Sequence, residues 1–211
     1  MKRKKLLTFL AILFSFVIVN GQNKENSIEP EDGIMINGVK WATRNVNMPG
    51  TFAANPEDAG LFYQWGSNVG WSSTDPLTAT DGINTWRDFF EEGDTWLPAK
   101  NPCPDGWRVP TYAELQSLKT VTKECSNLNG VNGYFIGDGE PKLFLPAAGG
   151  RSNSDGSLYG TGVSWWSGSY WSSTQGRTGA YKLTFFYSGG FAPSYHYYRA
   201  VGFSVRCVAE N

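Results

Sequence analysis

The chain has 211 residues, with 25 Gly, 9 Trp, 10 Tyr and 13 Phe, and its formal net charge at pH 7 is -1. Without an excess of basic residues it lacks the electrostatic footprint of a nucleic-acid-binding protein and the basic face of a binder of anionic membranes. Many aromatic residues among many glycines predict short strands, tight turns and long loops, with few long helices.

The first 21 residues have the pattern of a secretory signal peptide. The basic residues at positions 2–5 precede an apolar run from Leu6 to Val19, and Gly21 offers a small residue for cleavage. The run is shorter than the roughly 20 residues that span a bilayer, so we expect cleavage rather than a membrane anchor. No cysteine lies nearby, which argues against a lipoprotein.

Cleavage would leave a secreted or cell-surface protein, with the periplasm as an alternative, and no membrane insertion. It would remove four basic residues and no acidic ones, so Lys+Arg would fall from 18 to 14 against 19 Asp+Glu. Residues 22–32 are polar and include Pro30, which is typical of a flexible lead-in. Residues 33–211 are expected to form one domain with a sizeable core.

A β-hairpin is predicted where this domain begins. Two apolar stretches, 34–36 and 39–43, flank Asn37-Gly38, a pair that tolerates the positive φ angles of a type I′ turn. The pattern leaves open whether Trp41 faces inward or lies at an edge. A short aromatic strand is expected within residues 60–66. Residues 68–97 are irregular and indicate a loop-like insertion, in which 86–92 could form a helical turn.

The segment 103–115 combines a turn, a tryptophan placed to pack, and a helix start. Residues 104–106, Pro-Asp-Gly, are a turn signal. Thr111 and Glu114 have the spacing of a capping box. Apolar residues at helical spacing then predict a helix over residues 112–123. These apolar residues are Leu115, Leu118 and Val121.

Strands dominate the rest of the chain. The expected strands are 134–136, 143–146, 168–174, 180–185 and 200–208. Alternation in the last strand would place Phe203, Val205 and Cys207 on one face.

Three cysteines remain after signal cleavage. In an oxidising compartment an odd count means one bridge with a spare thiol, or an intermolecular bridge. We predict the bridge Cys103–Cys207, which an inward Cys207 favours, and a free Cys125 near the end of the predicted helix. In the chain-entropy model, a disulfide that closes a loop of this size raises the free energy of the unfolded chain by about 4.7 kcal/mol.

Six ordered blocks, which together span about residues 34–208, resemble the Fibrobacter succinogenes major paralogous domain of secreted proteins from Bacteroidota and Fibrobacter. The blocks are Ile36–Val46 (INGVKWATRNV), Gly60–Trp65 (GLFYQW), Cys103–Thr111 (CPDGWRVPT), Leu145–Arg151 (LPAAGGR), Tyr170–Thr174 (YWSST) and Gly202–Val208 (GFSVRCV). The resemblance implies an α+β, C-type-lectin-like fold with a small twisted antiparallel sheet, one or two helices and long loops. That fold is related to formylglycine-generating enzymes, and its N- and C-terminal strands usually pair.

The sequence predicts no metal and no cofactor. Calcium-binding lectins of this fold carry Glu-Pro-Asn or Gln-Pro-Asp, whereas Lys142 follows Glu140-Pro141 here, and a lysine opposes a cation site. We interpret Asp138, Glu140 and Asp155 as solvated loop carboxylates. His196 is the only histidine and no close cysteine pair exists, which disfavours transition metals.

We also predict no catalytic residues. A Ser–His–Asp arrangement would have to use His196, which lies in an aromatic run. Formylglycine-generating enzymes use a pair of reactive cysteines, and no equivalent pair is evident. Asp88, Glu91 and Glu92 could serve glycoside hydrolysis, but we interpret them as a solvated charged turn.

Aromatic residues in loops are the remaining candidates for a ligand site, because sugar rings stack on Trp and Tyr. The candidates are Trp71, Trp86, Trp96, Trp165, Trp166, Tyr195 and Tyr197. The tryptophans within the resembling blocks are assigned to the core. The leading hypothesis is a secreted, non-enzymatic module that binds a glycan or a surface protein. A structural component of a surface appendage is the alternative, and an enzyme of the formylglycine-generating type is the weaker one.

Overall fold

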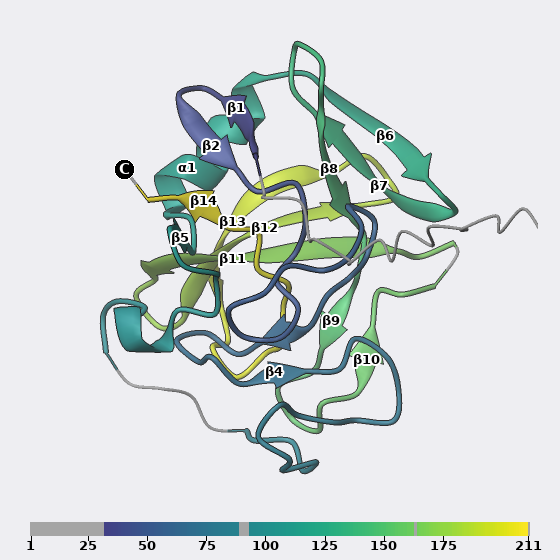
Figure 1. The fold of residues 1–211 in the computed structure, drawn as a ribbon. Coiled ribbons are helices and arrows are strands. Elements are labelled where there is room, and N and C mark those ends of the chain that lie inside the picture. The colour runs from purple at the N-terminus through teal and green to yellow at the C-terminus, as the bar shows by residue number, and fades with distance from the viewer. Residues whose placement is uncertain (1–31, 89–92, 163, 211) are drawn as a thin grey trace, which may run out of the picture. The chain divides into compact units, whose positions relative to one another are not determined.

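The computed structural model describes residues 32–88, 93–162 and 164–210 (Figure 1). The predicted signal peptide, nearly all of the lead-in, and Glu91 and Glu92 lie outside the described residues. No helix of the described residues is long and apolar enough to cross a membrane.

Small antiparallel sheets and one short α-helix make up the described part of the chain, as expected for an α+β fold. The strands before the helix are β1 (Ile34–Ile36), β2 (Val39–Trp41), β3 (Phe62–Tyr63), β4 (Gly70–Trp71) and β5 (Trp107–Arg108). The helical elements are a 3₁₀ turn (Pro98–Lys100), α1 (Tyr112–Ser117) and a second 3₁₀ turn (Leu118–Thr120). The later strands are β6 (Lys123–Leu128), β7 (Val131–Ile136), β8 (Leu143–Pro146), β9 (Gly150–Arg151), β10 (Leu158–Tyr159), β11 (Ser167–Gln175), β12 (Ala180–Phe186), β13 (Phe191–Tyr197) and β14 (Val208–Ala209).

The predicted N-terminal hairpin is confirmed. β1 pairs with β2, and the connecting Asn37 and Gly38 have φ angles of 51° and 77°. These positive angles are those of a type I′ turn, whose twist matches that of paired strands. Trp41 is fully buried, which answers the question that the sequence left open. The hairpin belongs to the sheet β1-β2-β14-β5, in which Val208 pairs with both Trp41 and Arg108.

The disulfide between Cys103 and Cys207 is confirmed, with Cα atoms 6.1 Å apart. Both cysteines are buried, and the bond joins the turn before β5 to the segment before β14. Cys125 is free and exposed.

The helix prediction was correct only in its first half. Thr111 and Glu114 form the complete capping box, and α1 begins at Tyr112. The helix ends at Ser117, however, and β6 already begins at Lys123. Three of the four residues at 119–122 are Thr or Val, which lose side-chain freedom in a helix. Pairing with β7 therefore replaces the last predicted turns, and Cys125 lies within a strand instead of near a helix end.

The predicted closing strand over residues 200–208 was also largely wrong. Only Val208 and Ala209 form a strand there, and Gly202, Phe203 and Ser204 make isolated bridges. Residues 201–208 are all buried, so no face alternates with solvent. The segment runs through the interior, which explains why its bridging partners come from several different elements.

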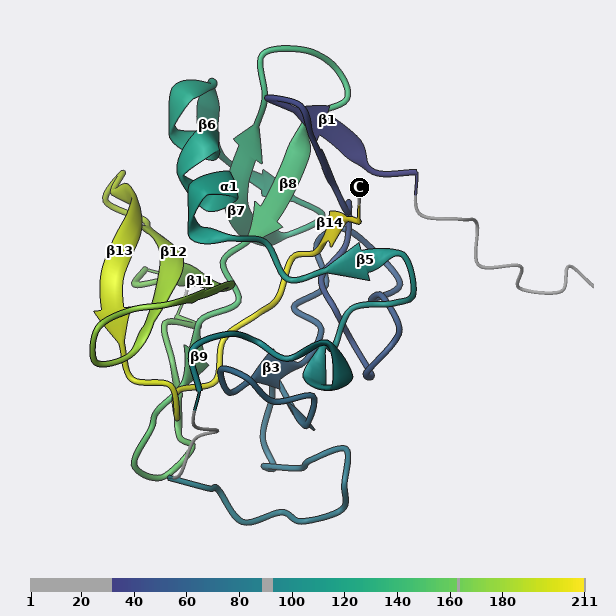
Figure 2. The same cartoon turned by 90° about the vertical axis from the view of Figure 1, so that its left-hand side faces the viewer.

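Residues of the sheet β11-β12-β13 contribute to two hydrophobic clusters. Figure 2 shows this sheet beside α1. Tyr170, Leu183 and Phe185 pack into one cluster together with Leu115 of α1 and Leu118 of the following 3₁₀ turn. Trp171 enters the other cluster with Phe203. Neighbouring residues of a strand point to opposite faces, so this sheet is buried on both sides.

The charged residue Lys182 is buried beside the second hydrophobic cluster, the one that contains Trp171 and Phe203. It is 6% exposed, its Nζ donates a hydrogen bond of 3.1 Å to Ser169 Oγ, and it lies 4.5 and 4.7 Å from the ring centroids of Tyr197 and Phe203. Among the described residues no carboxylate forms an ion pair with it. Burial lowers the pKa of this amine from its ordinary 10.5 to about 8.

Replacing Lys182 by Met is expected to stabilise the protein at neutral pH. Below pH 8 the folded state must bury an ammonium ion, whereas between pH 8 and 10.5 only the unfolded state keeps the proton, so stability rises with pH. The variant should therefore gain up to about 3 kcal/mol in the free energy of unfolding at pH 7 and little at pH 10 or above. Urea unfolding at both pH values measures this. The exposed Lys40→Met is the control, and an equal gain at both pH values would contradict the prediction.

Candidate functional site

Two of the tryptophans of the insertion hold it to the rest of the domain. Trp71 is fully buried, and its ring lies 4.7 Å from that of Trp86. Trp86 is half-buried and its Nε1 donates to the backbone oxygen of Asn153 at 3.1 Å. Gly156 packs so closely under Trp86 that a Cβ there would lie 2.7 Å from the ring. Neither indole therefore offers a free face to a ligand.

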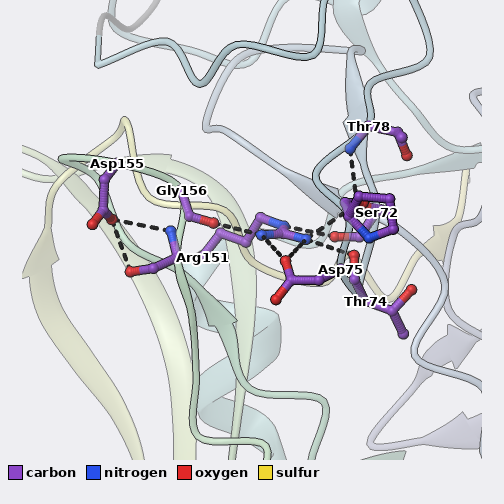
Figure 3. Close-up of polar contacts among 9 residues, drawn as sticks. Ser72, Thr74, Asp75, Thr78, Arg151, Asp155 and Gly156 are labelled. Carbon is purple, nitrogen blue, oxygen red and sulfur yellow. Dashed lines mark hydrogen bonds and ion pairs between the residues drawn. The ribbon is translucent and has the colours of Figure 1, made fainter.

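The side chain of Arg151 holds the same insertion through hydrogen bonds to its backbone (Figure 3). This side chain is fully buried and donates through Nε to Ser72 O at 2.7 Å, through Nη1 to Gly156 O at 2.5 Å, and through Nη2 to Thr74 O at 2.7 Å. Asp75 lies 3.3 Å from Nη2, and its side chain is 73% exposed. The guanidinium is thus occupied by backbone carbonyls, which makes it a structural group and not a binding group.

Trp96, the third insertion tryptophan, borders a depression of about 410 Å³ beside the disulfide. The ring is only 7% exposed, packs on Trp65 and donates through Nε1 to Lys100 O at 2.8 Å. The half-buried Trp107 lies in the same depression and packs edge-on against Phe52. Trp96 therefore offers almost no ring surface to a ligand, and part of Trp107 is covered by Phe52.

Most polar groups of this depression already have partners. Asn101 donates to Trp107 O and accepts from Cys103 N. Arg108 forms a two-bond ion pair with Glu114 at 2.7 and 2.9 Å. Burial raises the pKa of Glu114, but hydrogen bonds from Arg108 and Thr111 bring it below its usual value. Asp105 and Glu210 supply exposed carboxylates at the rim.

The most exposed aromatic cluster of the described residues lies at one end of the sheet β11-β12-β13. We call Trp165, Phe186 and Tyr187, which are 73%, 44% and 42% exposed, the aromatic platform. The rings of Trp165 and Tyr187 meet edge to face with centroids 5.0 Å apart.

Residues next to the aromatic platform are held in place by core packing and strand pairing. Trp166 is 9% exposed and packs against Tyr134 in the first hydrophobic cluster, so the residue next to Trp165 is held in the core. Tyr187 N donates to Trp166 O at 3.3 Å, and Phe186 lies opposite Ser167 in the β11–β12 pairing. The candidate Trp166 thus belongs to the support, and Trp165 belongs to the surface.

Sequence reasoning identified Trp165 but missed both of its partners in the platform. Phe186 and Tyr187 immediately precede Ser188-Gly189-Gly190, a turn signal. Two aromatic residues at a glycine-rich hairpin turn are a detectable sign of an exposed aromatic tip, because a hairpin turn has few neighbours to cover it.

Tyr197 lies at the opposite end of this sheet. It pairs with Ala180, is 37% exposed and packs against Phe203 and the 68% exposed Tyr198. The side chains of Tyr195 and His196 are outside the described part of the structure.

The loop carboxylates do not converge. Thr122 donates to Asp138 through N and Oγ1, and Ser157 donates to Asp155 in the same way. These hydrogen bonds lower the pKa of both carboxyl groups below the usual value. Within the described ranges no group of three or more His, Cys, Asp or Glu residues could hold a metal ion.

The buried Lys182–Ser169 contact is the other arrangement with potential chemistry, since an amine beside a hydroxyl can activate it. Both residues are more than 90% buried, and neither lines the depression beside the disulfide. A substrate would have no access to this pair.

Comparison with protein-family models, with curated proteins and with solved structures finds no match for this chain.

Proposed function

We propose that this protein is a secreted, non-enzymatic binding module that recognises a glycan through the aromatic platform. The observation that carries the proposal is the 73% exposed ring of Trp165 beside Tyr187 at the end of a packed sheet. A large apolar ring left in water costs free energy unless a ligand covers it, and clustered exposed aromatics mark binding surfaces.

Sugars fit such a platform because their C–H faces are flat and apolar. Trp165 and Tyr187 are both exposed and their ring planes meet at 74°, so one ligand can contact both rings, and the Tyr187 hydroxyl is available to hydrogen-bond a sugar hydroxyl. Anchoring of Trp166 in the core restricts the backbone at Trp165 before binding, so little conformational entropy remains to be lost. A protein surface is the second candidate ligand, since exposed aromatics also serve protein recognition.

The proposal includes a C-type-lectin-like fold of the Fibrobacter succinogenes major paralogous domain type. Pairing of the N-terminal hairpin with the C-terminal strand supports it, as does the bridge from Cys103 to the last segment. The signal peptide remains part of this proposal, and the disulfide supports an oxidising compartment.

Truncating the platform is expected to weaken glycan binding. On a glycan array, or by calorimetry with a glycan that binds the unmodified protein, Trp165→Ala and Tyr187→Ala should each raise Kd by about tenfold or more, equivalent to about 1.4 kcal/mol or more. Tyr198→Ala is the matched control, because Tyr198 is 68% exposed but adjoins Tyr197 at the opposite end of β12.

Three results separate the alternatives. Equal weakening by Tyr198→Ala would show a nonspecific aromatic effect and contradict the platform. Protein recognition would be favoured if no glycan binds the unmodified protein, a cell-surface protein does bind it, and Trp165→Ala abolishes that binding. Co-purification with surface polymer proteins that survives both platform substitutions would favour an appendage component instead.

A further inference from the structure

β6 is an edge strand of the sheet β6-β7-β8 and lies on its outer side in Figure 1. Two backbone hydrogen bonds show which residues of each strand bond to which neighbouring strand. Ala147 N donates to Asn132 O between β8 and β7, and Gly137 N donates to Thr122 O between the ends of β7 and β6. Alternate residues of a strand bond to opposite neighbours. The backbone N–H and C=O groups of Lys123, Cys125 and Asn127 therefore point away from β7.

These three outward residues form a row of unused backbone donors and acceptors. Within the described residues their backbone groups have no backbone hydrogen-bond partner. β6 is six residues long, contains no proline, and has Glu124, Cys125 and Asn127 exposed. Proteins usually protect such an edge with proline, charged side chains, a bulge or a covering segment, because it is a template for another strand. β6 carries the charged Lys123 and Glu124, but no proline and no bulge.

We propose that β6 pairs with β6 of a second copy of this chain, antiparallel and centred on Cys125. A two-fold axis through an edge strand places the central residue opposite itself, so the two Cys125 residues face each other. Lys123 then lies opposite Asn127 of the second copy, and Glu124 lies opposite Ser126. The backbone N–H and C=O groups of the three outward residues on one strand would form hydrogen bonds with those of the three outward residues on the other strand.

The side chains of β6 allow this self-pairing. The register places no like charges directly opposite each other, and like charges there would oppose pairing. Lys142 already lies 3.4 Å from Glu124 and offsets its charge. Pairing on the other register, one residue along, would leave the outward backbone groups without aligned partners and move Cys125 off the axis.

The central position also suits a covalent link. Hydrogen-bonded antiparallel pairs have Cα atoms about 5.5 Å apart, within the range of about 4.4–6.8 Å for a disulfide, while their Cβ atoms, about 5.5 Å apart, must approach to about 4.5 Å for the bond to form. Cys125 is exposed and is the one cysteine outside the Cys103–Cys207 bond.

The link forms by thiol–disulfide exchange with a low-molecular-weight disulfide such as oxidised glutathione. The Cys125 thiolate attacks that disulfide and releases one glutathione thiolate. Cys125 of the second copy then attacks the mixed disulfide and releases the other. Two protein thiols are oxidised and one glutathione disulfide is reduced to two thiols, which take up the two protons that the protein thiols lose on ionisation.

The test compares two matched variants in a glutathione redox buffer. Asn127→Glu places a carboxylate opposite Lys123 of the second copy, and Asn127→Lys places two ammonium groups opposite each other, in both cases twice per dimer. Both variants replace the amide that accepts the turn bond from Gly130 N, so their cross-linking rates are compared at equal concentrations of folded monomer. Dimer formation, followed by non-reducing electrophoresis, should be about tenfold faster for Asn127→Glu than for Asn127→Lys.

Further measurements secure the result. Cys125→Ser should abolish the covalent dimer, and amide hydrogen exchange at Lys123, Cys125 and Asn127 should slow in the wild-type dimer but not in the monomer. The proposal is overturned if Cys125 only acquires glutathione, or if both Asn127 variants cross-link at the same rate. Unchanged exchange at the three amides in the dimer would overturn it as well, because the link would then be a random thiol encounter.

Discussion

Replacing Cys103 and Cys207 together by Ala is expected to lower the free energy of unfolding by about 2–5 kcal/mol. The bond spans 104 positions of sequence, so its removal frees a long loop in the unfolded chain. In the folded state it joins the turn before β5 to the segment before β14, and these strands lie side by side in one sheet. The variant should therefore also fray at its C-terminal strand.

Thermal and denaturant unfolding of the Cys103→Ala, Cys207→Ala double variant, compared with the protein that keeps both cysteines, measures this loss. Cys125→Ser is the reference background for both proteins, since it removes the exposed thiol through which two copies are proposed to cross-link, and the comparison then reports the Cys103–Cys207 bond alone. A double variant as stable as the reference would mean that the sheet β1-β2-β14-β5 holds the terminus without the bond. Hydrogen exchange at Val208 would then remain as slow as in the wild-type protein.

Replacing Arg151 by Met is expected to cost about 3–5 kcal/mol. The change removes the charged donor of three hydrogen bonds, to the carbonyl oxygens of Ser72, Thr74 and Gly156, and such bonds contribute about 1.5–3 kcal/mol each, less the cost of burying the guanidinium. Met fills much of the volume, so the loss reports hydrogen bonding more than packing. The segment that contains Ser72 and Thr74 should also become accessible to protease before the rest of the domain unfolds.

Denaturant unfolding together with limited proteolysis tests this expectation. Asp75→Asn is the control: the Asp75 side chain is 73% exposed, so its ion pair with Arg151 should contribute little. Arg151→Lys should lie between the two, because an ammonium group cannot reach three separated carbonyls as the planar guanidinium does. A loss of similar size in Asp75→Asn would assign the stability to the ion pair and not to the carbonyl bonds.

The aromatic candidates show where prediction from sequence reached its limit. Trp71, Trp96 and Trp165 all lie in segments that looked like loops, yet they are 0%, 7% and 73% exposed. Composition and turn signals identify a segment as irregular, but whether its tryptophan is covered depends on residues far away in the chain. Trp71 is covered by Trp86, and that ring is bonded to the loop at Asn153.

Helix boundaries show the same limit on a smaller scale. The capping box at Thr111 and Glu114 was readable because the two groups bond to each other across three residues. The end of the helix could not be read from the sequence, because the spacing of the buried Leu118 and Val121 suits both a helix and the observed 3₁₀ turn. Strand pairing of β6 with β7 decides between them, and that contact is absent from any local window.

Local chemistry in the sequence by itself determined the turn at Asn37-Gly38, the start of α1 and the choice of Cys103 and Cys207 as partners. Each depends on backbone angles or on groups close in the chain, or on a small number of possible pairings. Only the tertiary structure decided which rings face solvent and where Arg151 and Lys182 are buried. It also decided that β6 has a free edge. These properties depend on which distant segments come together, because burial and sheet pairing are made by neighbours in space.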